Sequence, residues 1–364
     1  MAAAQRSTWR NTRNTWHVFW RIARPNRPSP FQRWTHPVSV VERVVPVTGG
    51  LLQVRLYQPP VHSATIVLNG GFVPESIDDP RLINFATALA ETGFLVLTPD
   101  YPAVRALEFT PTTIDQIVGL VSHVRQSSAW CGPRPLALIG LSYVGTLSLK
   151  AALRPDLSAP PEFLGVFGGY ADFGELMRAV FQDVYRSDGI AVPVDPYGRS
   201  LVLRAVVDHF DPPPAERDRI REVTLAIGRR RPWEPWGEID ASITALSPAG
   251  QACVAAMRAF HPDRAPEQWE RILREFRNTI AELSVREPAE RLRSRLVILH
   301  SVYDHILPCV GSVLLHRQFP ASRLVLTAMF THVNPRLSPA LLWSHARELG
   351  ALSRVFGELM ALQG

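Results

Sequence analysis

A serine stands where a predicted strand turns directly into a predicted helix. The segment Leu136–Gly145 reads L-A-L-I-G-L-S-Y-V-G, so an apolar strand runs into Gly140-Leu141-Ser142-Tyr143. A tight strand-to-helix turn projects the serine hydroxyl beyond the end of the strand, and small neighbours leave room for the backbone. The pattern predicts Ser142 as a nucleophile, and the alternative is a structural serine at a helix start.

A serine hydroxyl is a weak nucleophile at neutral pH, so it needs a base, and the base needs an acid that orients it. Two later segments offer such groups just after predicted strands. Asp304 follows the strand Leu296–His300, and His332 follows the strand Leu324–Phe330. Ligand sites in open α/β sheets form at the carboxyl ends of the strands. A simple helix cap before Val310 remains the alternative for Asp304.

These segments resemble those of the α/β-hydrolase superfamily. The family's nucleophile motif is G-x-S-x-G, and this chain has Val144 in place of the second glycine, with Gly145 one position later. The D-x-x-L-P pattern that begins at Asp304 resembles the family's acid loop, and the segment around His332 resembles its histidine loop. The resemblance implies a Ser142–His332–Asp304 triad, in which histidine is the base.

The segment Leu68–Phe72, L-N-G-G-F, resembles the family's H-G-G turn, with Asn69 in the histidine position. The resemblance implies that the backbone amides of Gly71 and Tyr143 hold the oxyanion. Phe72 is the alternative donor and is expected to contact the substrate. A plain glycine turn is the other interpretation of this segment.

The elements that must position these residues alternate along the chain. Val40–Val47 and Leu51–Tyr57 read as an antiparallel hairpin, and Pro46 favours a sheet edge for its first strand. Apolar strands separated by helices then predict an α/β fold with a mostly parallel, doubly wound sheet. The predicted strands are Ala64–Leu68, Phe94–Leu97, Leu136–Gly140 and Phe163–Phe167, and the predicted helices are Pro80–Thr92, Thr113–Val124 and Thr146–Leu153.

This alternation stops between about Ala171 and Arg293, where helical patterns dominate, and then resumes with a helix at Val310–Phe319 and another at Leu341–Leu362. Such an interruption predicts a helical cap inserted in a hydrolase core. The expected parts are an arm at 1–37, core at 38–171, cap at 172–293 and core at 294–364. The clearest cap helices are predicted at Phe173–Arg186, Tyr197–Phe210, Glu216–Arg229 and Pro266–Leu283.

The N-terminal arm is basic and aromatic. No acidic residue occurs from Met1 to Val41, and Trp9, Trp16 and Trp20 recur at helical spacing among arginines. One interpretation of residues 1–36 is a helix that touches anionic lipid at a membrane surface. A second is an arm packed on its own domain with the tryptophans buried. A transit peptide is a third.

The composition excludes several other classes. The chain has 364 residues, a formal charge of +6, and 46% hydrophobic residues, as expected for a globular protein. Basic residues cluster only at the N-terminus, so nucleic-acid binding is not expected. Cys131, Cys253 and Cys309 form neither a disulfide framework nor a metal-ligand spacing, which fits a cytoplasmic protein. No apolar run is long enough for a membrane span.

Together these features predict a serine hydrolase that cleaves a small-molecule carboxylic ester, thioester or amide through an acyl-serine intermediate. This chemistry requires no metal and no organic cofactor. Two alternatives stay open: a binding protein that keeps the fold without the activity, and an acyltransferase that uses the same triad. The sequence does not indicate the oligomeric state.

Overall fold

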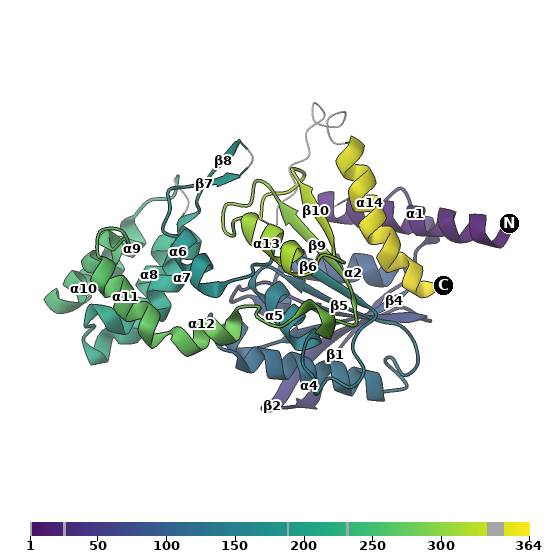
Figure 1. Cartoon of the computed structure of the whole chain (residues 1–364), viewed down its shortest axis with the longest axis horizontal. Helices are drawn as coiled ribbons and strands as arrows, with labels where there is room; N and C mark the ends of the chain where they lie inside the picture. The colour runs from purple at the N-terminus through teal and green to yellow at the C-terminus, as the bar shows by residue number, and fades with distance from the viewer. Residues whose placement is uncertain (1, 25–26, 188, 231–232, 333–345) are drawn as a thin grey trace. The chain divides into compact units, whose positions relative to one another are not determined.

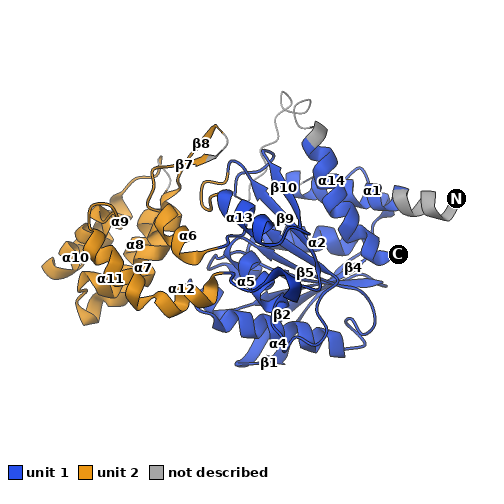
Figure 2. Cartoon of the chain, in the orientation of Figure 1, with its two compact units in different colours: residues 1–171, 285–303, 309–364 blue, residues 172–284, 304–308 orange. Residues whose placement is uncertain are grey.

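The computed structural model describes residues 2–24, 27–187, 189–230, 233–332 and 346–364. The chain forms two compact units, coloured separately in Figure 2. The first unit comprises residues 1–171, 285–303 and 309–364, and the second comprises residues 172–284 and 304–308.

An eight-stranded sheet forms the centre of the first unit (Figure 1). Its strand order is β1-β2-β4-β3-β5-β6-β9-β10. β2 pairs antiparallel with β1 and β4, and the remaining neighbours are parallel, which confirms the predicted mostly parallel sheet. Pro46 lies on β1, the strand at one edge. The strands are β1 (Ser39–Val47), β2 (Gly50–Gln58), β3 (Ala64–Asn69), β4 (Phe94–Asp100), β5 (Leu136–Leu141), β6 (Phe163–Phe167), β9 (Arg295–Ser301) and β10 (Arg323–Thr327).

Helices cover both faces of this sheet, so its central strands are apolar on both sides (Figure 1). Every residue of β3 and β4 is buried. Ile139 of β5 joins a core cluster with side chains from three helices, α1 (Ala2–Ala23), α2 (Pro80–Glu91) and α14 (Ala346–Met360). Gly140, the next residue, faces α5 (Tyr143–Ala152). That second face is also covered by α4 (Thr112–Gln126) and α13 (Val310–Gln318).

The start of α2 shows how local sequence sets an element. Asp79 is its N-cap and accepts a hydrogen bond of 2.8 Å from the amide of Arg81, while Pro80 occupies the first turn. These residues suit a helix start because backbone N–H groups in the first turn have no partner within the helix. The Asp79 side chain accepts from one of them, and Pro80 has no N–H group. Gly93 has φ +102° directly after the helix, a conformation that favours glycine.

The N-terminal helix α1 packs on α2 and α14 through one of its faces. Val18 is fully buried, Phe19 meets Phe356 edge to face at 4.9 Å, and His17 Nε2 lies 2.8 Å from the Glu91 carboxylate. Arg21 forms an ion pair with the same carboxylate, with Nε 3.3 Å from Oε2. The arm therefore packs on its own unit, but Trp9 and Trp16 remain exposed instead of buried.

We expect Glu91→Gln to lower the free energy of unfolding by about 2 kcal/mol at neutral pH, because the charge facing His17 and Arg21 is lost. Burial opposes ionisation of Glu91, but the hydrogen bond with His17 and the charge of Arg21 outweigh it and hold its pKa below the ordinary 4.5. A carboxyl whose pKa is lowered on folding stabilises the protein above its ordinary pKa and loses this contribution as the pH falls through the folded value. The difference between wild type and variant should shrink below about pH 4.5.

Urea titrations at about pH 7 and about pH 4 measure this difference. Glu108→Gln, which changes an exposed carboxylate of the same unit, is the matched control and should alter stability by less than about 0.5 kcal/mol. An equal loss in both variants, or a loss that does not change with pH, would contradict the role given to Glu91.

The second unit is mainly helical, with one difference from the sequence prediction. The helix predicted over Phe173–Arg186 ends early, as α6 (Phe173–Ala179), and a hairpin follows. Its strands β7 (Val184–Ser187) and β8 (Ile190–Pro193) pair antiparallel, with Gly189 at φ +78° in the turn. The prediction was wrong because the apolar spacing of a helix continued into a short segment rich in β-branched and aromatic residues.

The remaining helices of the second unit follow the predicted regions, with finer divisions. Pro266–Leu283 is two helices that meet at Phe276, and α9 and α10 lie in a region without a predicted element. The helices are α7 (Pro196–Ala205), α8 (Arg217–Arg229), α9 (Gly237–Thr244), α10 (Pro248–Ala259), α11 (Pro266–Glu275) and α12 (Arg277–Leu283).

The second unit consists of Asp172–Ser284 and Asp304–Pro308, and the helical cap was predicted over residues 172–293. The amide of Val285 donates to the carbonyl of Ala171, so the chain rejoins the first unit directly after the insertion. Of the predicted helix Leu341–Leu362, residues 341–345 lie outside the described residues, and α14 covers Ala346–Met360. Across the described parts of the chain, none of the helices combines the length and apolar character needed to cross a lipid bilayer.

Candidate active site

Ser142 lies on the strained turn that the sequence predicts, between β5 and α5. Its φ is +56° and its ψ is −137°, a backbone conformation that costs a non-glycine residue about 1–3 kcal/mol. The surroundings hold this conformation by two backbone bonds: the Ser142 amide donates to Phe167 O at 2.6 Å, and the Gly145 amide donates to Ser142 O at 2.9 Å. These two hydrogen bonds thus fix the backbone of the turn at the carboxyl end of β5.

Glycines make this turn possible because the strand and the helix approach closely. A Cβ atom at Gly140 would lie 2.4 Å from Ser148 Oγ and 2.7 Å from Gly145 Cα. A Cβ atom at Gly145 would lie 2.9 Å from Gly140 O. Val144 is fully buried at the position where the family motif has glycine. The close approach therefore falls on Gly145, and Val144 fits beside it.

His332 comes within hydrogen-bonding distance of Ser142 although 190 residues separate them in the chain. His332 Nε2 lies 2.9 Å from Ser142 Oγ. This is the separation required of a general base that takes a proton from the hydroxyl. The structure thus brings together the two residues predicted as nucleophile and base.

The loop that carries His332 begins earlier than predicted, because β10 ends at Thr327 and not at Phe330. Beyond Thr327, side chains of other segments bond to the backbone of the loop. The Glu348 carboxylate accepts from the Ala328 amide at 2.7 Å, and the Ser301 hydroxyl donates to Phe330 O. These bonds anchor the loop on both sides before His332.

Asp304 belongs to segment 304–308, which clusters with the second unit. Its side chain is buried, and Oδ1 accepts hydrogen bonds from the amides of Ile306 at 2.9 Å and Leu307 at 2.8 Å. The neighbouring His305 pairs with Asp195, also of the second unit, at 3.5 Å. The carboxylate thus organises its own loop, and its pairing with His332 stays a prediction.

The predicted oxyanion segment lies directly against the nucleophile. A Cβ atom built on Gly71 would be 3.6 Å from Ser142 Cβ, so the Gly71 backbone passes beside the serine. An aromatic cluster adjoins it: Phe72 contacts Tyr143 with ring centroids 4.7 Å apart and stacks on Phe109 at 4.9 Å. Tyr170 also stacks on Tyr143, with ring centroids 6.0 Å apart. Burial raises the pKa of Tyr143, so its phenol is neutral at physiological pH.

Asn69 belongs to a buried network of hydrogen bonds that could not be predicted from the sequence. Tyr101 Oη donates to Asn69 Oδ1 at 3.0 Å, Asn69 Nδ2 donates to Ser148 Oγ at 2.8 Å, and Ser148 Oγ donates to Val144 O at 2.9 Å. Burial raises the pKa of Tyr101, which keeps its phenol a donor. This hydrogen-bond network links the ends of β3 and β4 to the first turn of α5. It therefore fixes the Gly71 loop relative to the serine turn.

A second serine–histidine pair lies elsewhere in the first unit. His300 Nδ1 is 2.7 Å from Ser312 Oγ, and both side chains are almost fully buried. Ser312 Oγ also donates to Gly169 O at 3.2 Å. Its hydroxyl sits in α13, in ordinary helical backbone, and has no access to solvent. This pair is therefore structural.

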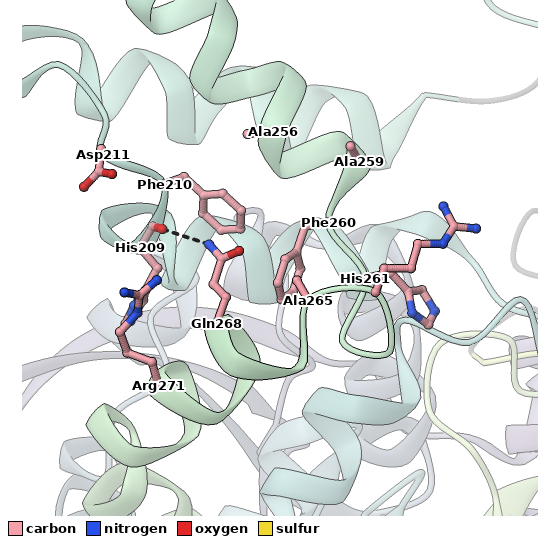
Figure 3. Close-up of a pocket in the computed structure, with 11 residues that line it drawn as sticks. His209, Phe210, Asp211, Ala256, Ala259, Phe260, His261, Ala265, Gln268 and Arg271 are labelled. Carbon is pink, nitrogen blue, oxygen red and sulfur yellow. Dashed lines mark hydrogen bonds between the residues drawn. The ribbon is translucent and has the colours of Figure 1, made fainter.

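A pocket of about 450 Å³ lies within the second unit (Figure 3). Phe210 and Phe260 meet edge to face at 5.4 Å, and Gln268 Nε2 donates to His209 O at 2.9 Å. None of the residues predicted for catalysis lines it. The lining residues are His209, Phe210, Asp211, Ala256, Ala259, Phe260, His261, Arg264, Ala265, Gln268 and Arg271.

The strand order, the parallel centre and the serine turn define an α/β-hydrolase fold, and one solved structure supports this assignment. A candidate hydrolase from Legionella pneumophila has a TM-score of 0.54 and 15% identity, with 94% of each chain covered. An esterase from Pyrobaculum calidifontis has a TM-score of 0.46 and 14% identity, covering 90% of this chain and 86% of the esterase.

An acylaminoacyl peptidase from Pyrococcus horikoshii has a TM-score of 0.47 and 11% identity. The match covers 90% of this chain but 42% of the peptidase, so this chain spans less than half of that enzyme's length. No family model matches the sequence, and no curated protein is similar to it at the sequence level.

Proposed function

We propose that the protein is a serine hydrolase that cleaves a carboxylic ester through an acyl-serine intermediate. The observation that carries the proposal is the 2.9 Å approach of His332 Nε2 to Ser142 Oγ, with the serine held at positive φ. This combination gives one hydroxyl a base and places it just beyond the carboxyl end of β5. Thioesters and amides are substrates of the same chemistry.

In the proposed reaction, Ser142 Oγ attacks the substrate carbonyl carbon while its proton passes to His332 Nε2. The negative charge on the carbonyl oxygen is held by the amides of Gly71 and Tyr143. His332 then gives the proton to the leaving alcohol, and the C–O bond breaks to leave an acyl-serine. Water attacks this ester by the same route and releases the acid. Asp304 orients the imidazole and stabilises its protonated form.

Two departures from the family motif favour an inactive binding protein, but two observations support the active enzyme. Val144 is buried without disturbing the turn. Asn69, in the position of the family's histidine, bonds to Tyr101 and Ser148 and so ties the oxyanion loop in place. Neither residue removes a group that the proposed reaction uses. The aromatic cluster beside Tyr143 favours an apolar acyl group.

The proposal is tested by incubating the full chain with p-nitrophenyl esters of increasing acyl length and with a fluorophosphonate probe. We expect ester hydrolysis with a preference for apolar acyl groups, and covalent labelling at neutral pH. Adding an alcohol or amine acceptor and analysing the products distinguishes hydrolysis from acyl transfer. A chain that neither hydrolyses any ester nor reacts with the probe would contradict the proposal.

Asn69→Ala is expected to lower kcat by about tenfold to a hundredfold with little change in KM, because the oxyanion loop loses its tie to α5. Tyr101→Phe removes one bond of the hydrogen-bond network and keeps the link between Asn69 and Ser148, so its effect should be smaller. Steady-state kinetics with a p-nitrophenyl ester measure both. If Tyr101→Phe is as damaging as Asn69→Ala, or if only KM rises, the residue does not act by positioning this loop.

A further inference from the structure

One side of α1 remains exposed after the helix has packed on the first unit. Trp9 is 57% exposed and Trp16 is 37% exposed. Positions 9, 13 and 16 follow the spacing i, i+4, i+7, so Trp9, Arg13 and Trp16 share one helix face. His17 and Val18 are buried on the packed side. The outward face of α1 therefore presents two indole rings, and between these positions Arg13 donates from Nη2 to Asn14 Oδ1 at 2.8 Å.

Trp34 extends this face beyond the helix. It lies in η1 (Gln32–Trp34) and is 39% exposed. The guanidinium carbon of Arg33 lies 3.8 Å from the centroid of its ring, and that of Arg13 lies 5.9 Å from it. The cation–π contact of Arg13 joins η1 to α1. We call the set Trp9, Arg13, Trp16, Arg33 and Trp34 the tryptophan–arginine surface.

The segment that carries this surface has charged side chains of one sign. The sequence from Met1 to Val41 contains seven arginines and no acidic residue. The Glu91 carboxylate, which contacts α1, lies on the packed side and is held by His17 and Arg21. A partner that binds this surface must therefore contact indole rings and carry negative charge.

We propose that the tryptophan–arginine surface binds the interfacial region of an anionic lipid bilayer. Indole rings partition to the boundary between headgroups and acyl chains, because the ring is apolar and its N–H is polar. Arginine side chains bind lipid phosphates, and an amphipathic helix with these two features lies in the plane of the interface. A second copy of the chain fits less well, because two-fold pairing would place the same arginines opposite one another.

The test is co-sedimentation of the full chain with vesicles of phosphatidylcholine containing about 30% phosphatidylglycerol, and with phosphatidylcholine vesicles alone. We expect binding to the anionic vesicles that weakens between about 0.1 M and about 0.5 M salt. Replacing both Trp9→Ala and Trp16→Ala should weaken it by about tenfold or more. Arg13→Gln combined with Arg33→Gln should weaken it and reduce the salt dependence.

Two matched controls separate this surface from general surface effects. Trp233→Ala changes a tryptophan that is 81% exposed in the second unit, and Arg317→Gln changes an exposed arginine of α13; both should bind as wild type does. Thermal melts of all variants show whether they fold. The proposal is overturned if the wild-type protein does not bind anionic vesicles. It is also overturned if the Trp9→Ala, Trp16→Ala double variant binds them as tightly as the wild type. Gel filtration that shows dimers lost in this double variant, without vesicle binding, would also overturn it.

Discussion

Ser142→Ala is expected to abolish labelling by a fluorophosphonate and to lower kcat for ester hydrolysis by about 10⁴ to 10⁶-fold. The reason is that the substitution removes the oxygen that would form the acyl intermediate and would give its proton to His332. A loss of 10⁶-fold corresponds to about 8 kcal/mol of transition-state stabilisation. Mass spectrometry of the labelled protein and steady-state kinetics measure the two effects.

The chain supplies a matched control for this experiment. Ser312 is also bonded to a histidine, with His300 Nδ1 at 2.7 Å from its hydroxyl, but it lies within a helix and is fully buried. Ser312→Ala should therefore keep full labelling, with any loss confined to stability. Labelling that persists in Ser142→Ala, or disappears in Ser312→Ala while the protein stays folded, would show that the nucleophile is a different residue.

The sequence predicted the parallel sheet because burial on both faces leaves a simple pattern. β3 and β4 are apolar along most of their length, and short strands of this kind between amphipathic helices have few other solutions. The hairpin β7–β8 was missed for the opposite reason. Its strands have four residues each, and the neighbouring helix α6 carries apolar spacing that continues toward them.

In the candidate site too, some residues follow from local sequence and others depend on contacts between distant segments. The turn at Ser142 is local, so Gly140 and the strand before it predicted the nucleophile. The distance from Ser142 to His332 depends on where β5 and β10 lie in the sheet, and the order of motifs along the chain could only suggest it. The hydrogen bonds of Asn69 join residues 32 and 79 positions apart, and no local pattern marks such partners.

Asp304→Asn is expected to lower kcat by about 10³ to 10⁴-fold while the protein stays folded. The substitution removes the negative charge but keeps an oxygen that can accept from the amides of Ile306 and Leu307, so the loop retains its two hydrogen bonds. In the proposed triad, the imidazole of His332 would lose the carboxylate that holds its tautomer and stabilises its protonated form. Kinetics with a p-nitrophenyl ester and thermal melts measure activity and folding separately.

Comparison with two further variants distinguishes a catalytic carboxylate from a structural one. Asp304→Ala also removes both loop hydrogen bonds and should cost about 1–3 kcal/mol more in stability than Asp304→Asn, with a similar loss of kcat. His305→Gln alters the adjacent residue, which pairs with Asp195, and should change kcat by less than about threefold. If Asp304→Asn retains nearly full activity and only Asp304→Ala loses kcat, Asp304 only stabilises its own loop. The acid that orients His332 must then come from another carboxylate.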